Sequence, residues 1–322
     1  MPASPLSSSE SRILGSTNLV RSSAGAPASW ARLLAQAGAD GGFLHAGPAG
    51  EALTAWVSAL AAEGLPLSGL ELPQAQGPLG QGKRLPHWAS PDDAEERLAA
   101  IRSADEVLAV AGSAGAAWAL LDAIPLALKA PWPLFARAYA ERRFDPEGHA
   151  HPAARALLRS ARQERTDRAE RLLDAGRFAL ERLAQVADRR QAVLAISHGG
   201  TPWHFPSPRE RDQLLEEFSG ALLVRAYAPA RLRVLETLGL LSPERGEEAK
   251  RAPIVVATDA VGLMDDLLPG LGPAPLDEPL GQDAEGTRPP AFVVVSGRPG
   301  CTSVELQEAV ARLRRLTRKN GN

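Results

Sequence analysis

The chain has 322 residues and nearly balanced charge, with 36 Lys and Arg against 38 Asp and Glu and a formal net charge of −2. Hydrophobic residues make up 44% and charged residues 23% of the sequence, which is typical of a globular protein with a sizeable core. This balance leaves no basic surface of the kind that nucleic acid requires, so we expect no nucleic-acid partner. Because Cys301 is the only cysteine, an internal disulfide and a cysteine-based zinc site are both excluded.

Targeting and membrane signals are missing from the sequence. No run approaches the roughly 18 apolar residues that read as a membrane span. The first residues carry Glu10 and Arg12 and no apolar core, so we expect neither a secretory signal nor a membrane partner and predict a cytoplasmic protein. Residues 1–11 and 318–322 are expected to be tails that flank a single domain over 12–317.

Short apolar runs alternate with segments of helical spacing, a pattern that predicts βα units around a parallel sheet. Runs such as 192–196, 254–257 and 292–295 are continuously apolar, as expected for strands that are covered on both faces. The eight predicted strands are 12–15, 42–45, 67–72, 117–123, 192–197, 221–225, 253–258 and 291–296. Eight strands in alternation with seven or eight helices predict an α/β protein, the (β/α)₈ TIM barrel, in preference to an open doubly wound sheet.

Capping signals place the predicted helices. Ser207 with Glu210, and Thr302 with Glu305, have the spacing of capping boxes. Further helices are predicted over 30–37, over 51–62, after Ser90-Pro91, after Ser242-Pro243, and as one long charged helix over 151–190. The segments 73–86 and 130–149 are predicted to be irregular, and 259–290 is predicted to be either a helix or, because of its prolines and glycines, mostly loop.

In such a barrel the functional site lies where the strands end, at their carboxyl side. The polar residues at or just after the predicted strand ends are Ser16, Thr17, Asn18, His45, Glu71, Asp122, Ser197, His198, Arg225, Tyr227, Asp259, Ser296 and Arg298. Any one of them could simply anchor a loop by a hydrogen bond.

The segment 198–207, HGGTPWHFPS, follows a well-defined strand and precedes a capped helix. Its paired glycines allow a backbone to approach a ligand closely, so Trp203 and His204 are candidates for the wall of a binding site. A rigid turn whose aromatic rings pack on the edge of the barrel explains the same residues equally well. Cys301 lies at a predicted helix start, where the pKa of a thiol can fall, but no base stands near it and we interpret it as a bystander. No dinucleotide-binding, phosphate-binding or G-x-S-x-G motif follows a strand.

Several stretches, taken in order, resemble one family. They are 37–42 (AGADGG), 89–97 (ASPDDAEER), 194–202 (LAISHGGTP), 258–260 (TDA) and 269–277 (PGLG…D). On these stretches the chain resembles the sugar phosphate isomerase/epimerase family with the xylose isomerase-like TIM barrel, over roughly residues 12–317. The resemblance implies a divalent metal ion held by Glu, Asp, His and Glu from the ends of strands five to eight, with the two glutamates moving a proton.

The sequence departs from that ligand set. The fifth strand ends in Ser197-His198, the sixth is followed by no carboxylate near Arg225, Val256 stands where the family's histidine is expected, and the eighth strand ends in Ser296. Arg225, Arg231 and Arg298 gather near these positions, which favours an anion-binding rim unless the arginines pair with nearby carboxylates.

We therefore expect a degenerate, metal-free member that binds a small anionic or sugar-like molecule, without a cofactor. His198, Asp259 and Glu71 are the predicted catalytic residues. The predicted ligand-binding residues are His45, Trp203, His204, Arg225, Tyr227 and Arg298. The alternative is an active sugar isomerase or epimerase whose divergent site holds Mn, Mg, Co or Zn, and a homo-oligomer is left open. A nuclease of the related apurinic-site type is disfavoured by the near-neutral charge and the small number of histidines.

Overall fold

Eight parallel strands close into a barrel in this computed structural model, which describes residues 11–19, 26–45, 51–72, 88–141, 152–199, 201–218, 223–237, 252–261, 264–269, 271–272, 276, 280, 290–297 and 300–318. In chain order the barrel strands are β1 (Arg12–Ser16), β2 (Gly41–Leu44), β3 (Leu67–Glu71), β4 (Trp118–Leu121), β6 (Val193–Ile196), β8 (Leu223–Tyr227), β9 (Ile254–Ala257) and β12 (Phe292–Val295). Each pairs in parallel with its neighbours, and β1 pairs with β12 to close the ring. The predicted barrel and all eight predicted strands are confirmed, with bounds that differ by a residue or two.

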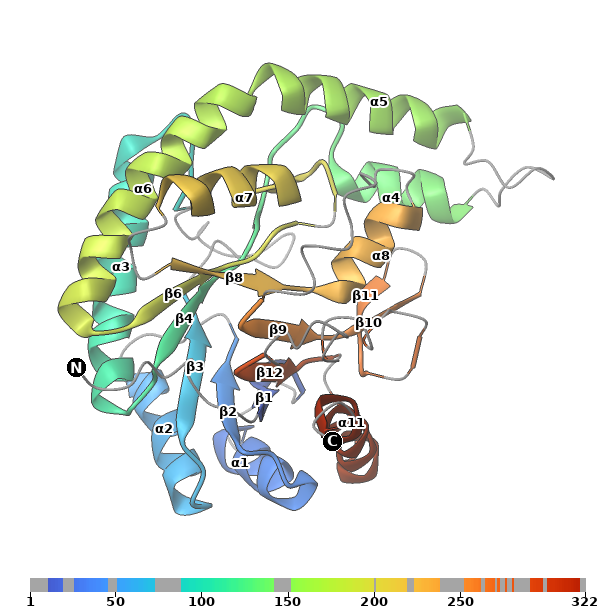
Figure 1. Ribbon diagram of the computed structural model, residues 1–322. Coiled ribbons are helices and arrows are strands. Elements are labelled where there is room, and N and C mark those ends of the chain that lie inside the picture. Colours follow the sequence, from blue (N-terminus) through green and yellow to red (C-terminus); the bar gives the residue numbers. More distant parts are fainter. Residues whose placement is uncertain are drawn as a thin grey trace.

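Helices surround the strands (Figure 1). They are α1 (Ala26–Ala37), α2 (Glu51–Ala62), α3 (Ala94–Ser113), α4 (Trp132–Glu141), α5 (Pro152–Asp167), α6 (Ala169–Arg190), α7 (Pro208–Glu217), α8 (Pro229–Thr237) and α11 (Ser303–Arg318). Both predicted capping boxes form, at Ser207 with Glu210 and at Thr302 with Glu305. Among the described residues, none of the helices combines the length and apolar composition that a bilayer crossing requires.

The alternation of side chains along each strand divides the core into two layers. Leu14, Phe43 and Trp118 belong to a cluster inside the barrel, together with residues such as Leu120, Ala195, Ala226, Ile254 and Val294. The intervening residues of the same strands, such as Leu44 and Leu194, pack outward against the helices. Gly69 lets the inner layer close, because a Cβ there would stand 2.4 Å from the Trp118 ring. Alternate residues of a strand therefore face the inside of the barrel, and the residues between them face the helices.

Two predicted helices, the one after Ser90-Pro91 and the one over 151–190, are wrong in their bounds. The helix expected after Ser90-Pro91 begins later, because the Asp93 side chain accepts a hydrogen bond from Glu96 N and caps α3. The long helix predicted over 151–190 is divided at Arg168 into α5 and α6. The apolar faces of these two helices have different partners, since α6 packs on α3 and α5 packs on α4. Figure 1 shows α5 turning away from α6 across the top of the view.

The segments 130–149 and 259–290 both contain regular structure beyond what the sequence predicts. The 130–149 insertion includes α4, because Pro133 falls in the first turn of the helix, where a missing N–H costs nothing. The 259–290 segment begins with an antiparallel pair, β10 (Asp259–Val261) with β11 (Met264–Leu267). A second short pair joins β5 (Ile124–Pro125) to β7 (His204–Phe205). Residues 1–10 of the predicted tail 1–11, the loop 73–86 and the helix at Ser242 lie outside the described residues.

Candidate functional site

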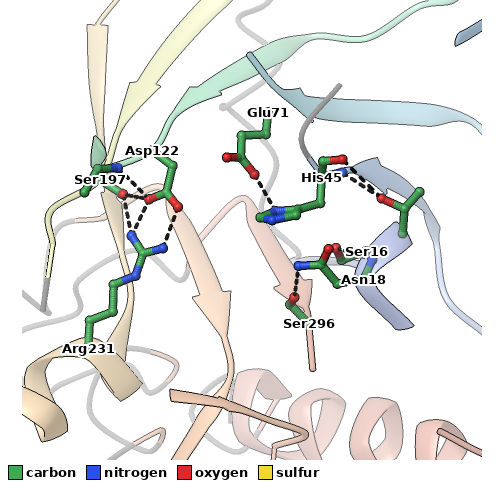
Figure 2. A network of polar contacts seen from close by, with 10 residues as sticks. Ser16, Asn18, His45, Glu71, Asp122, Ser197, Arg231 and Ser296 are labelled. Atoms are coloured by element: carbon green, nitrogen blue, oxygen red, sulfur yellow. Dashed lines mark hydrogen bonds and ion pairs between the residues drawn. The ribbon is translucent and has the colours of Figure 1, made fainter. Parts of the chain in front are cut away.

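A ring of polar side chains covers the carboxyl end of the barrel. The strand alternation that places Leu14, Phe43 and Val294 inside the barrel also directs the residues two positions later, Ser16, His45 and Ser296, inward. The same count assigns Glu71, Asp122, Ser197 and Thr258 to this ring, with Ala228 completing it after β8. Figure 2 shows most of these residues converging from different strands. The ring is the floor of any site at this face of the barrel.

His45 and Glu71 form an ion pair within the ring, between His45 Nδ1 and Glu71 Oε2 (Figure 2). The Glu71 side chain is 0% exposed and the His45 side chain 23% exposed. Thr17 Oγ1 accepts a hydrogen bond of 2.9 Å from His45 N, which fixes the backbone of His45 where β2 ends. Burial lowers the pKa of His45, but the charge and the hydrogen bond of Glu71 outweigh it, so the pKa lies above its ordinary value.

Asp122, Arg231 and Ser197 form a second polar group in the ring (Figure 2). Both terminal nitrogens of Arg231 donate to the two oxygens of the Asp122 carboxylate, a bidentate contact between α8 and the end of β4. Arg231 Nη1 also donates to Ser197 Oγ at 3.0 Å and to the carbonyl of His198 at 3.1 Å. Burial raises the pKa of the Asp122 carboxyl, but the charge and hydrogen bonds of Arg231, together with the hydrogen bonds of Ser197 and the Ala123 N–H, outweigh it and hold that pKa well below its usual range, so Asp122 is ionised at neutral pH.

Hydroxyl groups occupy the part of the ring between β9 and β1. Asn18 Nδ2 donates to Ser296 Oγ at 3.4 Å, and Ser16 Oγ accepts from Asn18 N at 3.2 Å. Thr258 follows β9 and is buried, as Ser296 is after β12. This side of the ring offers neutral hydrogen-bonding groups, whereas His45, Glu71 and Asp122 lie after β2, β3 and β4 and Arg231 reaches Asp122 from α8.

The residues do not fit the divalent metal ion that the resemblance implies. The inward positions after β6, β8, β9 and β12 hold Ser197, Ala228, Thr258 and Ser296, none of which supplies a carboxylate or an imidazole. In the parts of the chain that the structure describes, no three His, Cys, Asp or Glu side chains are grouped so that they could hold a metal ion. Glu71 and Asp122 are each already paired with a side chain of the protein itself, His45 and Arg231 respectively. A hard divalent ion needs several oxygen ligands, and this ring does not assemble them.

Three predicted site residues point away from the ring. His198 follows the inward Ser197 and so enters the outer layer, where it is fully buried. Burial and the nearby Arg211 of α7 lower the pKa of His198 well below its ordinary value. Arg225 and Tyr227 flank the inward Ala226, and Arg225 pairs at 2.9 Å with Asp212 of α7. The alternative that the arginines pair with carboxylates holds for both Arg225 and Arg231.

The two aromatic residues of the 198–207 segment have different surroundings. Trp203 is buried against Phe135 and Trp132 of α4, and its indole N–H donates to the carbonyl of Ala130. His204 lies beside β5, which follows Asp122, and its Nδ1 is 2.6 Å from Thr201 Oγ1. Burial and the charge of Arg231 lower the pKa of His204 to about 4, so its ring is neutral at pH 7. Trp203 therefore packs as the rigid-turn interpretation expected, whereas His204 stands near the Asp122–Arg231 pair.

Asp259 and Arg298 are the remaining predicted site residues. Asp259 begins β10, beyond the inward Thr258, and its side chain lies outside the described residues, as does all of Arg298. The Cys301 thiol donates to the carbonyl of Leu19, and burial raises its pKa, which is opposite to the shift that a helix start can cause. The roles assigned to His198, Asp259, Arg225, Tyr227 and Arg298 stay predictions.

The sequence reasoning did not include Asp122, Ser197 and Arg231 among the site residues. Asp122 and Ser197 were recognised as strand-end residues, and counting from the inward Leu120 and Ala195 of the same strands would have separated them from His198. The approach of Arg231 to Asp122 joins residues 109 positions apart, and no local pattern in the sequence encodes it.

Comparison with known proteins identifies the fold. No family model matches the sequence, and no curated protein is a significant match. A 3-keto-D-glucoside 4-epimerase from E. coli superposes with a TM-score of 0.59 at 15% identity, covering 95% of this chain and 99% of that one. A xylose isomerase-like TIM barrel protein from Mycobacterium smegmatis, in complex with magnesium, gives a TM-score of 0.59 at 14% identity, with 96% and 97% covered. A D-tagatose 3-epimerase-like protein gives 0.61 at 11% identity, with 96% and 98% covered.

Proposed function

We propose that this protein, whose fold is that of the xylose isomerase-like TIM barrels, binds a small sugar-like molecule at the carboxyl end of its barrel without a divalent metal ion. The single observation that carries the proposal is the ring of inward-facing residues. It combines hydroxyl groups, an imidazole and paired charges on one surface, which is the chemistry that a polyhydroxy ligand needs.

Metal independence follows from the way in which charge is balanced in the ring. Glu71 pairs with His45, and Asp122 pairs with Arg231, so each carboxylate already has a partner from the protein beside it. A divalent ion would have to displace the bidentate guanidinium of Arg231 to reach the buried Asp122, and that contact is among the stronger ones that a carboxylate makes. Arg231 thus supplies positive charge beside Asp122, where a metal ion would otherwise bring it.

A neutral polyhydroxy ligand agrees with these contacts better than an anion does. The anionic version depended on Arg225, Arg231 and Arg298 gathering at the rim. Arg225 is directed to Asp212 in the outer layer, and Arg231 forms a bidentate pair with Asp122. Hydroxyls such as those of Ser296 and Thr258 can both donate hydrogen bonds to sugar hydroxyls and accept them. We therefore favour the sugar-like ligand over the anionic one.

Calorimetric titration of chelator-treated protein tests this proposal, with D-fructose and D-tagatose as neutral probes and fructose 6-phosphate as the anionic probe. We expect at least one neutral hexose to bind, and we expect Ser296→Ala to weaken that binding about tenfold by removing one hydrogen bond. Ser113→Ala is the matched control, because the Ser113 hydroxyl bonds only its own helix at the far end of α3. Binding of the phosphate ester alone would support the anionic alternative, and binding that appears only with added Mg²⁺ or Mn²⁺ would support a metal-dependent isomerase or epimerase.

A further inference from the structure

The pairing of His45 with Glu71 suggests a chemical role beyond binding. We infer that His45 moves a proton at the carbon beside the carbonyl group of a bound hydroxy ketone or hydroxy aldehyde, with Glu71 orienting its ring. This inference rests on the proposed function, because it needs a sugar-like ligand at the same face of the barrel.

The position of the imidazole is set from three directions. His45 follows β2, and the alternation of side chains that directs Phe43 inward also directs the His45 imidazole inward. Thr17, which follows β1, holds the His45 backbone through contacts to both its N–H and its carbonyl. Glu71, at the end of β3, contacts Nδ1. Because contacts from three adjacent strand ends hold it, the His45 imidazole has little freedom to move. A group that exchanges a proton with a fixed atom of a ligand needs such a fixed position.

The His45 and Glu71 side chains differ in their exposure to solvent. The Glu71 side chain is completely buried, whereas nearly a quarter of the His45 side chain is exposed. Because Nδ1 is held by Glu71, Nε2 is the ring nitrogen that a ligand at the barrel mouth can reach. Figure 2 shows the imidazole of His45 between Glu71 and the Asn18–Ser296 pair, across the barrel mouth from Asp122 and Arg231. The acid–base atom is therefore on the ligand side, and its orienting carboxylate is behind it.

The chemical step balances without a metal ion. The C–H bond beside the carbonyl breaks, its proton passes to the unprotonated Nε2 of His45, and its electron pair forms the carbon–carbon double bond of an enediolate. The carbonyl oxygen takes the negative charge, and the hydroxyl groups of the ring, such as those of Ser296 and Thr258, can donate hydrogen bonds to it. Return of the proton from Nε2 re-forms the C–H bond and the carbonyl group.

Charged groups on three elements act on His45. Glu71 from β3 and Asp122 from the end of β4 raise its pKa, while Arg231 from α8 lowers it. Burial acts in the lowering direction, and the net pKa is above the ordinary value. An imidazole that a carboxylate holds at Nδ1 can both accept a proton at Nε2 and return it. Loss of the Glu71 charge leaves burial dominant, so the pKa of His45 should then fall.

Hydrogen–deuterium exchange into D-tagatose, followed by proton NMR in D₂O, measures this step directly. We expect the wild type to exchange the protons on the carbons beside the carbonyl, and we expect His45→Gln to slow that exchange at least 100-fold while D-tagatose still binds. Glu71→Gln keeps the shape of the side chain and should slow exchange less, with the midpoint of the pH–rate profile moved to lower pH. Glu217→Gln is the matched control, because it removes a carboxylate from an exposed pair with Arg177 on the outer helices.

The outcomes distinguish the proton-transfer role of His45 from the binding of a sugar-like ligand. Exchange at the wild-type rate in His45→Gln, or binding of D-tagatose with no exchange in the wild type, overturns the role of His45 and leaves the binding proposal standing. A Glu71→Gln profile identical to that of the wild type overturns the positioning role of Glu71 alone. Failure of the wild type to bind or exchange D-tagatose, D-fructose or dihydroxyacetone overturns both proposals together.

Discussion

Removing the carboxylate of Asp122 tests how strongly the barrel depends on its contact with Arg231. Asp122 accepts hydrogen bonds from Arg231, Ser197 and the N–H of Ala123, and its side chain is 7% exposed. Asp122→Asn keeps the shape but removes the carboxylate charge from beside a guanidinium that also donates to the Ser197 hydroxyl and the His198 carbonyl. Breaking a buried ion pair from one side costs about 3–5 kcal/mol. The Arg231 side chain is 25% exposed and so partly hydrated, which brings our expectation to about 2–3 kcal/mol.

Urea unfolding at pH 7 measures that cost, and we also expect the melting temperature to fall by about 5 °C. The double variant Asp122→Asn/Arg231→Met should lose less than the sum of the two single variants, because it leaves no uncompensated charge. Glu217→Gln breaks an exposed pair and should stay within about 1 kcal/mol of the wild type. If Asp122→Asn is no more destabilising than Glu217→Gln, the reasoning about this pair is refuted.

The pH dependence of the same variant has a definite sign. The pKa of Asp122 is lowered in the folded protein, so its contribution to stability is complete above the ordinary aspartate pKa of about 3.9. The contribution is lost as the pH falls further, through the folded-state pKa. The difference in unfolding free energy between the wild type and Asp122→Asn should therefore be constant from pH 6 to 7 and shrink below about pH 4. A difference that grows on acidification would contradict the assignment.

Three further predictions concern the framework around the site. Ser207→Ala removes the capping box of α7 and should cost about 1 kcal/mol in urea unfolding, a loss that Ser113→Ala should not reproduce. Gly69→Ala would place a Cβ 2.4 Å from the Trp118 ring and should cost about 1–3 kcal/mol, whereas Gly112→Ala, with 3.7 Å to the nearest atom, should be neutral or stabilising. The pKa of His204 is lowered to about 4, so the wild type should lose stability relative to His204→Gln as the pH falls from about 6.5 toward 4. An NMR titration that gives His204 an ordinary pKa near 6.5 would contradict this last expectation.

Much of the fold could be predicted because its signals are local. Continuous apolar runs mark strands that are covered on both faces, and capping residues mark where helices begin, so strands such as β6, β9 and β12 follow from the sequence alone. The predicted helix bounds are wrong where tertiary contacts, rather than local sequence, determine where a helix ends. Only the packing of α5 on α4 and of α6 on α3 explains why the helical stretch divides at Arg168.

The candidate site was predicted less completely than the fold. Every polar residue near a strand end was treated alike, although adjacent residues of a strand face opposite layers. Ser197 therefore enters the ring while His198 enters the outer layer, and Arg225 faces α7 rather than the barrel mouth. His45 and Glu71 were identified individually, but their contact depends on the pairing of β2 with β3. A pattern in the sequence indicates which residues end strands, and the register then decides which of them meet.

Calorimetric titration of one chelator-treated sample with D-tagatose, repeated after addition of Mg²⁺ or Mn²⁺, tests the central claim most directly. If the ring of inward-facing residues binds a sugar-like ligand with its own charges, the dissociation constant will be the same in both titrations, and Ser296→Ala will raise it in both. If D-tagatose binds only after the metal ion is added, the barrel holds a metal site that this ring does not explain, and the claim of metal-independent binding is wrong.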